Sequence, residues 1–158
     1  MPENQHACQC SCGETTFSVQ GSPLLRCYCH CTICQEFNQA AFADISIYMA
    51  KKVVLPSPES LEYKAYRPPP AVQRGKCKSC GSPAVEFLQI PLLAKLIIIP
   101  TSNLHQDCVV DPALHMFYHS RVSDIDDGLA KFNGYWKSQA AFGHKLIVSL
   151  LSGRASPK

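Results

Sequence analysis

The sequence predicts a mainly β fold, built as a sandwich or folded sheet of antiparallel strands. Two observations carry this prediction. Short runs of alternating or β-rich residues recur along the chain, and many of the twelve prolines fall at the breaks between them, in stretches such as Gly21-Ser-Pro23 and Pro56-Ser-Pro58. Many short strands fit this spacing of breaks better than long helices do.

Six segments are predicted as strands because each is β-rich and bounded by turn residues. In chain order they cover residues 15–19, 43–49, 61–66, 84–90, 96–99 and 115–119. Residues 34–41 could form one or two helical turns between the first two strands.

The last predicted element is a helix over residues 136–151, where apolar side chains recur at helical spacing. We expect this apolar face to pack on the protein's own domain, with a contact between two copies in a homodimer or a contact with a membrane surface as alternatives. Its members are Trp136, Ala140, Ile147, Leu150 and Leu151.

Length and composition exclude several classes of protein. The 158 residues suffice for one domain with a core, and 46% apolar against 17% charged residues is typical of a globular chain. The first five residues lack the basic and apolar regions of a signal peptide. The longest apolar run, residues 92–99, is interrupted by Lys95 and is far shorter than the roughly 18 residues needed to span a bilayer. We therefore expect a cytoplasmic protein with no membrane partner.

Nine of the ten cysteines fall in three clusters, which in a reducing compartment favours metal binding or catalysis over disulfides. The clusters are Cys8-Gln-Cys10-Ser-Cys12, Cys27-Tyr-Cys29-His-Cys31-Thr-Ile-Cys34 and Cys77-Lys-Ser-Cys80. Side chains at i and i+2 of a strand share a face, and a C-x-x-C pair presents two thiolates from a tight turn. Zinc, which takes four ligands in a closed site and three in an open one, fits these spacings.

Spacing permits two divisions of these ligands. In the simpler one, Cys10, Cys12, Cys77 and Cys80 form a closed site, while Cys29, Cys31 and Cys34 form a site with a vacant fourth position. In the rival division, Cys27 fills that position. Either division accounts for two zinc ions per chain.

The charge balance gives no support for a nucleic-acid partner. The formal net charge of +3 counts every cysteine as neutral, and two zinc ions held by seven thiolates would bring the total near zero. The longest basic run is Lys51-Lys52, so no basic surface is predicted.

With these motifs, the sequence resembles the family of glutathione-dependent formaldehyde-activating enzymes, which includes centromere protein V. The resemblance rests on Cys10-Ser-Cys12-Gly13 followed by Phe17, on Cys29-His30-Cys31-Thr-Ile-Cys34, and on Cys77-Lys-Ser-Cys80-Gly81-Ser82. It implies Mss4-like folded antiparallel sheets over residues 6–132, with 133–158 as a C-terminal extension. It also implies a structural zinc on Cys10, Cys12, Cys77 and Cys80 and a catalytic zinc on Cys29, Cys31 and Cys34.

The activity that the resemblance implies is that of an S-(hydroxymethyl)glutathione synthase, a carbon–sulfur lyase. Such an enzyme condenses glutathione with formaldehyde or another small aldehyde. Three thiolates quench much of the Lewis acidity of zinc, which leaves a centre better suited to deprotonating a fourth thiol than to making hydroxide. The three cysteines are then metal ligands, and no further catalytic residue is predicted.

Three alternatives to this activity stay open. The protein could be a relative with a different thiol substrate, a non-catalytic module that binds zinc or carries glutathione, or an interaction protein similar to the centromeric relative. The fold alone cannot choose among them.

Several residues have both a functional and a plain interpretation. Cys8 and Cys27 could enter a vacant coordination position or stay bystanders, and Cys108 is interpreted as a plain thiol. His30 is expected to pack or hydrogen-bond, and His105, His115 and His119 could approach a site in three dimensions. Tyr63, Tyr66, Arg67 and the prolines at 68–70 could line a pocket for the carboxylates of glutathione, or form a solvated loop.

Overall fold

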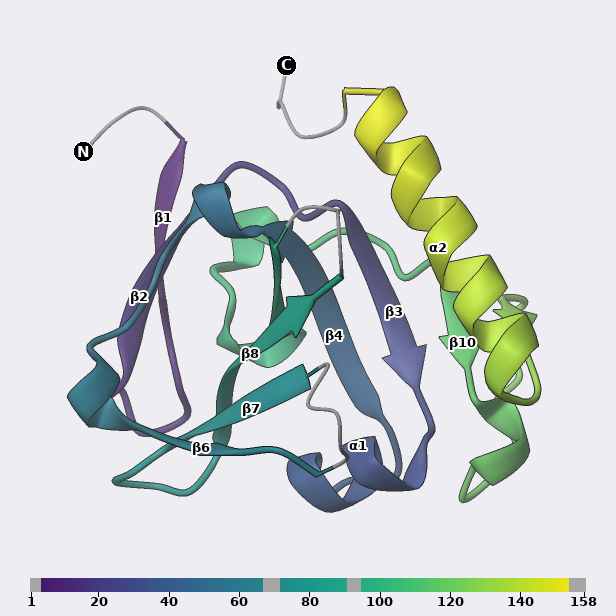
Figure 1. The fold of residues 1–158 in the computed structure, drawn as a ribbon, viewed down its shortest axis with the longest axis horizontal. Coiled ribbons are helices and arrows are strands. Elements are labelled where there is room, and N and C mark those ends of the chain that lie inside the picture. The colour runs from purple at the N-terminus through teal and green to yellow at the C-terminus, as the bar shows by residue number, and fades with distance from the viewer. Residues whose placement is uncertain (1–3, 67–71, 91–94, 154–158) are drawn as a thin grey trace.

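The computed structural model describes residues 4–66, 72–90 and 95–153 (Figure 1). Within these residues the strands form two sheets, which confirms the predicted fold class. The smaller sheet has the order β1-β2-β5 and is antiparallel. Its strands are β1 (Gln5–Gln9), β2 (Thr16–Gln20) and β5 (Val53–Val54).

The larger sheet has the order β11-β10-β3-β4-β9-β8-β7-β6. It is antiparallel except at one edge, where β10 runs parallel to both β3 and β11, a mixture that the sequence did not predict. Its strands are β3 (Leu25–Cys29), β4 (Ala43–Met49), β6 (Leu61–Lys64), β7 (Val72–Cys77), β8 (Pro83–Gln89), β9 (Lys95–Pro100), β10 (Leu114–Met116) and β11 (Ala130–Lys131).

The central strands of the larger sheet are buried on both faces, as β9 illustrates. Leu96 and Ile98 join an apolar cluster on the side of the C-terminal helix, whereas Ile97 and Ile99 join a second cluster on the side of the smaller sheet. Successive side chains of a strand point to opposite faces, so an unbroken apolar run serves two layers at once.

Helix α2 (Tyr135–Leu151) packs against β3 and β10, as Figure 1 shows. Its buried face consists of Ser138, Phe142, Leu146 and Ser149. The prediction that Trp136, Ala140, Ile147, Leu150 and Leu151 face the domain is therefore wrong: all five are exposed, Trp136 by 81% and Leu151 by 83%.

Two hydrogen-bonded serines explain why the buried face of α2 was missed. Ser149 Oγ donates to the Leu24 carbonyl at 2.5 Å, and Ser138 Oγ accepts the Phe117 N–H at 2.8 Å. Because both hydroxyls are hydrogen-bonded within the protein, serine can occupy buried positions of the helix. A search for apolar residues at helical spacing does not detect such positions. No helix in the described part of the chain combines the length and the apolar character needed to cross a bilayer.

Helix α1 (Thr32–Asn38) begins two residues earlier than predicted, directly after Cys31. It ends at Gln39, whose backbone is left-handed at φ +49°. The predicted strand over 115–119 stops at Met116, because Phe117 is also left-handed and turns the chain into a 3₁₀ turn. The 3₁₀ turns are Ala50–Lys52, Pro58–Ser60, Thr101–Asn103, Gln106–Cys108 and Tyr118–Ser120.

Candidate metal centres and the adjoining chamber

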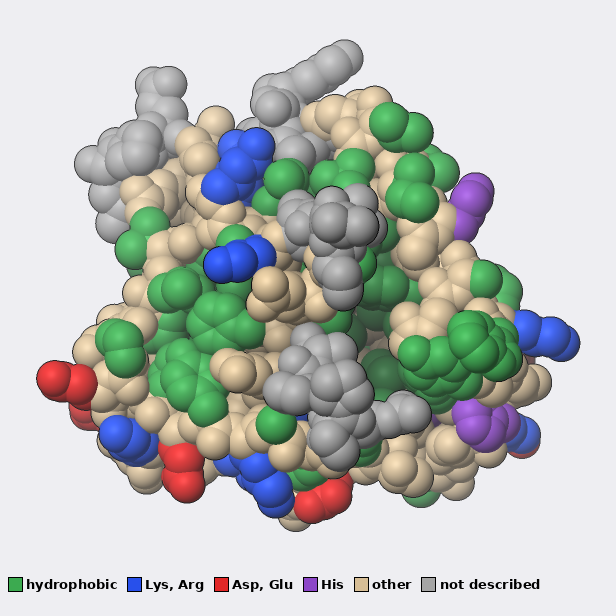
Figure 2. All heavy atoms as spheres, in the orientation of Figure 1, with side chains coloured by type: hydrophobic (Ala, Val, Ile, Leu, Met, Phe, Trp, Pro, Cys, Tyr) green, Lys and Arg blue, Asp and Glu red, His purple; other side chains and the backbone are tan. Residues whose placement is uncertain are grey.

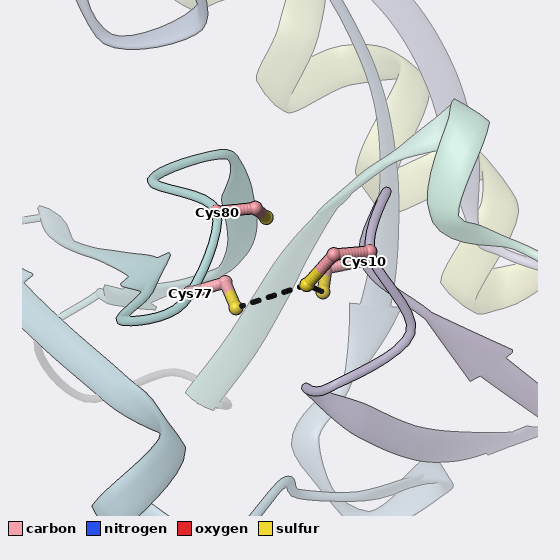
Figure 3. A group of neighbouring side chains, drawn as sticks. Cys10, Cys77 and Cys80 are labelled. Atoms are coloured by element: carbon pink, nitrogen blue, oxygen red, sulfur yellow. Dashed lines mark hydrogen bonds between the residues drawn. The ribbon is translucent and has the colours of Figure 1, made fainter.

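One cluster of four cysteines joins the two sheets. Cys10 and Cys12 lie in the loop after β1, while Cys77 ends β7 and Cys80 lies in the turn before β8; Figure 3 shows Cys77 and Cys80 on the turn that faces Cys10. Their sulfur atoms all lie within 4.8 Å of one another, with 3.5 Å from Cys10 to Cys12 and 3.7 Å from Cys12 to Cys77. A tetrahedral zinc with ~2.3 Å bonds to sulfur holds its sulfurs about 3.8 Å apart. The cluster therefore has the donors and the size for one four-coordinate ion.

The loops that carry these cysteines are closed by short backbone bonds. The Gly13 N–H donates to the Cys10 carbonyl at 3.0 Å, and the Gly81 N–H donates to the Cys77 carbonyl at 2.8 Å. Both glycines have positive φ, +81° and +70°, which glycine adopts without the steric penalty of a side chain. The Thr15 N–H donates to the Cys10 sulfur at 3.4 Å.

A second cluster of three cysteines is formed by a single short segment. Cys29 ends β3, and Cys31 and Cys34 lie at the start of α1, with their sulfurs also within 4.8 Å of one another. The Cys31 sulfur caps the helix by accepting the Cys34 N–H at 3.3 Å. Hydrogen bonds from Cys29 and Cys34 lower the pKa of Cys31 to about 3, so one thiolate is favoured even without a metal. These three donors could hold a metal ion with one position left open.

The remaining cysteines lie outside both clusters. Cys27 is fully buried and donates to the Met116 sulfur at 3.9 Å. Cys8 and Cys108 are buried in the apolar cluster between the two sheets, which agrees with the plain interpretation of Cys108. Burial raises the pKa of Cys108 to about 11, so its thiol stays protonated at neutral pH.

His30 hydrogen-bonds, as predicted. Its Nε2 lies 2.8 Å from Nδ1 of His115, whose Nε2 lies 2.6 Å from a carboxylate oxygen of Asp127. Lys131 and His115 hold the pKa of Asp127 well below its usual range, so this carboxylate is an acceptor. The chain of bonds links the backbone between Cys29 and Cys31 to β10 and to the segment before β11, at the nearer edge of the sheet.

The other histidines lie away from this relay. His119 Nδ1 accepts the Gly134 N–H at 2.8 Å, just before α2. His105 lies with His6 and Asp107 in a third group of candidate ligands, all partly or largely exposed.

A chamber of about 410 Å³ adjoins the three-cysteine cluster, and Cys29, Cys31 and Cys34 form part of its wall. It lies on the α2 side of the larger sheet, where Figure 2 shows hydrophobic side chains around a hollow. Its size is that of a small-molecule site. Most of its wall is apolar, formed among others by Ile45, Ile47, Leu88, Ile98, Met116 and Phe142.

One ion pair lies within this apolar wall. Arg74 of β7 and Glu86 of β8 are cross-strand partners, and Arg74 Nη1 donates to Oε2 of Glu86. The same nitrogen lies 3.9 Å from the Cys34 sulfur. Burial raises the pKa of Glu86 to about 7, although the charge of Arg74 opposes this shift. Oε1 of Glu86 is buried and has no hydrogen-bond partner within the described residues.

Sequence reasoning missed the ion pair. A hairpin closed symmetrically at Cys77–Cys80 would set Arg74 opposite Pro83, whereas the observed register, with its shift between Gly75 and Lys76, sets it opposite Glu86. Of the aromatic stretch, Tyr66 does line the chamber, whereas Tyr63 packs beside Phe87 and is 43% exposed. Arg67 and the prolines at 68–70 lie outside the described residues.

Two comparisons with known proteins found a match. The model of a family described as glutathione-dependent formaldehyde-activating enzyme matches residues 5–120. Among solved structures, the crystal structure of a structural-genomics protein from Rhodobacter sphaeroides matches with 18% identity and a TM-score of 0.48, over 67% of this chain and 91% of that one. A search of curated proteins found no match.

Proposed function

The chain belongs to the family of glutathione-dependent formaldehyde-activating enzymes, and from that premise we propose that it joins a thiol to a small aldehyde at the three-cysteine cluster. The description of the family names glutathione and formaldehyde. One observation carries the proposal: Cys29, Cys31 and Cys34 line a chamber, so a thiol bound there lies next to the coordination position that the chain leaves unfilled.

The reaction needs no oxidant or reductant. The thiol loses its proton, its sulfur forms a bond to the carbonyl carbon, and the electron pair of the carbon–oxygen π bond moves to the oxygen, which takes up a proton. A zinc ion held by Cys29, Cys31 and Cys34 would supply a fourth position at which an incoming thiol is deprotonated.

The chain's own contribution is placement. The apolar wall of the chamber would exclude water and hold the body of the thiol, which keeps its sulfur beside the cluster and leaves the aldehyde in reach. The Cys31 sulfur accepts the Cys34 N–H, so the ligand set is stabilised in its ionised form by the backbone itself.

We assign the four-cysteine cluster a structural role. Cys10 and Cys12 follow a strand of the smaller sheet, whereas Cys77 ends β7 of the larger sheet and Cys80 lies in the turn after it. A shared zinc would therefore tie the two sheets together. Four protein donors complete a tetrahedron and leave no position for substrate.

The test is exchange NMR on the protein carrying two zinc ions. It measures how fast formaldehyde interconverts with its adduct of glutathione or of 2-mercaptoethanol, against the same mixture without protein, since the reaction is also spontaneous. We expect acceleration that scales with protein concentration and disappears in Cys31→Ser. Cys27→Ser makes the same change at a buried cysteine outside the cluster and should keep the activity. Zinc-loaded protein that accelerates neither thiol would overturn the proposal.

A further inference from the structure

The chamber selects for charge as well as for size. Resting on the proposed function, we propose that the thiol substrate is uncharged with an apolar body, and that Glu86 excludes thiols that carry carboxylates. The ligand class is thus an aryl or alkyl thiol, in contrast to a charged peptide thiol.

The first support is the composition of the wall. The larger sheet contributes Ile45, Ile47 and Ile98 from its apolar core layer, and α2 contributes Phe142. Such surfaces gain free energy by covering an apolar ligand and gain none from covering a charged one. The few polar groups must therefore decide which charges are accepted.

The second support is that Arg74 is already occupied. Among the described residues that line the chamber, Arg74 is the one basic side chain, and it is therefore the group that would pair with a carboxylate. Its guanidinium donates to Glu86, approaches the Cys34 sulfur at 3.9 Å, and lies 5.5 Å from the ring centre of Phe37 and 6.0 Å from that of Tyr66. A substrate carboxylate that paired with Arg74 would have to displace Glu86, which is 1% exposed.

The third support is the net charge of the site. Three thiolates around one divalent zinc would carry −1, and Arg74 and Glu86 cancel each other. Oε1 of Glu86 adds an unpaired acceptor that is buried. A thiol with carboxylates, such as glutathione with two, would bring further anions into a low-dielectric site that already repels them, and unpaired buried carboxylates are strongly disfavoured.

The experiment compares two thiols of similar shape at pH 8. One is 4-(sulfanylmethyl)benzoate, and the other is (4-methylphenyl)methanethiol, which carries a methyl group in place of the carboxylate. Formaldehyde exchange is measured by NMR with zinc-loaded full-length protein, with glutathione as a third thiol. We expect the rate constant of the methyl compound to exceed those of both carboxylates at least tenfold. Equal rates, or faster exchange with glutathione, would overturn the proposal. If none of the three thiols is accelerated, the proposed function itself fails, which is a distinct result.

A binding measurement separates selection from chemistry. Isothermal titration calorimetry with the corresponding alcohols, 4-methylbenzyl alcohol and 4-(hydroxymethyl)benzoate, reports affinity for the chamber without a reaction. The methyl alcohol should bind at least tenfold more tightly. Tighter binding of the carboxylate would overturn the proposal.

Variants test the role of Glu86 directly. Glu86→Gln keeps the shape but frees Arg74 to pair with a carboxylate, so the preference for the methyl thiol should fall at least threefold. Glu62→Gln makes the same change on the exposed face of β6 and should leave the preference unchanged. Gln89→Lys adds a cation at an exposed part of the chamber wall, so it tests the same idea if Glu86→Gln does not fold. An unchanged preference in Glu86→Gln would overturn the role of Glu86, and an unchanged preference in Gln89→Lys would overturn selection by charge in the chamber.

Discussion

Nε2 of His30 lies 2.8 Å from Nδ1 of His115, and both rings are buried. The other ring nitrogen of His115 hydrogen-bonds to Asp127. His30, His115 and Asp127 therefore connect the peptide between Cys29 and Cys31 to the edge of the larger sheet. The relay holds the strand end that presents the three-cysteine cluster.

Replacing His115 should therefore destabilise the fold. His115→Phe fills the same space but leaves His30 buried without a partner, because Nδ1 of His30 already has none in the described structure. We expect the free energy of unfolding to fall by about 1–3 kcal/mol, the cost of a buried polar group left unpaired. Urea unfolding of zinc-loaded protein measures it. His144→Phe, on the exposed side of α2, is the control and should change stability by less than about 0.5 kcal/mol.

Loss of zinc should have different consequences at the two clusters. Cys77→Ser breaks the link between the sheets, so we expect one zinc per chain and a clearly lower melting temperature. Cys31→Ser also leaves one zinc but alters a site within one short segment, so melting should change less. Metal analysis and thermal unfolding, with and without a chelator, check both. Equal melting temperatures would contradict the structural assignment of the four-cysteine cluster.

Cys108 should react with iodoacetamide only slowly, and its pH dependence follows from its raised pKa. A thiol with a pKa of about 11 in place of the ordinary 9.0 holds less thiolate at any pH below that value. Alkylation in the folded protein should therefore keep rising about tenfold per pH unit from pH 8 to 10, since only the thiolate reacts. Peptide mass spectrometry measures it. In urea the same peptide should level off above pH 9, and levelling at that pH in the folded protein would sink the prediction.

The two faces of α2 should respond differently to truncation. Phe142→Ala removes a ring that is 8% exposed and packed in the core, so we expect a loss of about 3 kcal/mol or more. Trp136→Ala removes a larger ring that is 81% exposed, and stability should change by less than about 0.5 kcal/mol. Denaturant unfolding distinguishes them, and a larger effect at Trp136 would place the helix the other way round.

Local patterns predicted those strands whose sequences are rich in apolar and β-branched residues. The alternation over residues 43–49 predicted the bounds of β4, because its apolar residues Ala43, Ile45, Ile47 and Met49 recur on one face of the strand. β3 was missed because its sequence, Leu-Arg-Cys-Tyr-Cys, reads as a metal-binding stretch. Its Arg26 is held by a two-point ion pair with Asp44 on β4, a contact that no local pattern reveals.

For the site, spacing predicted the cysteines that meet but not the chamber beside them. The two clusters follow from C-x-C and C-x-x-C geometry, which is local. The chamber needs β4, β8, β9 and α2 to be placed around it, so it depends on tertiary structure. The predicted buried face of α2 was wrong because apolar residues also occupy its exposed side, and a helical period does not say which side faces the core.

The two cysteine clusters differ in the length of chain that each must close. Cys29 to Cys34 is one short stretch, complete as soon as α1 is made, whereas the other cluster joins Cys10 to Cys80 across β2 to β7. Closing a long loop costs more entropy and waits for the distant segment to be synthesised. A nascent chain would thus form the three-cysteine cluster early and the four-cysteine cluster late, so we expect metal to bind first at the cluster beside the chamber.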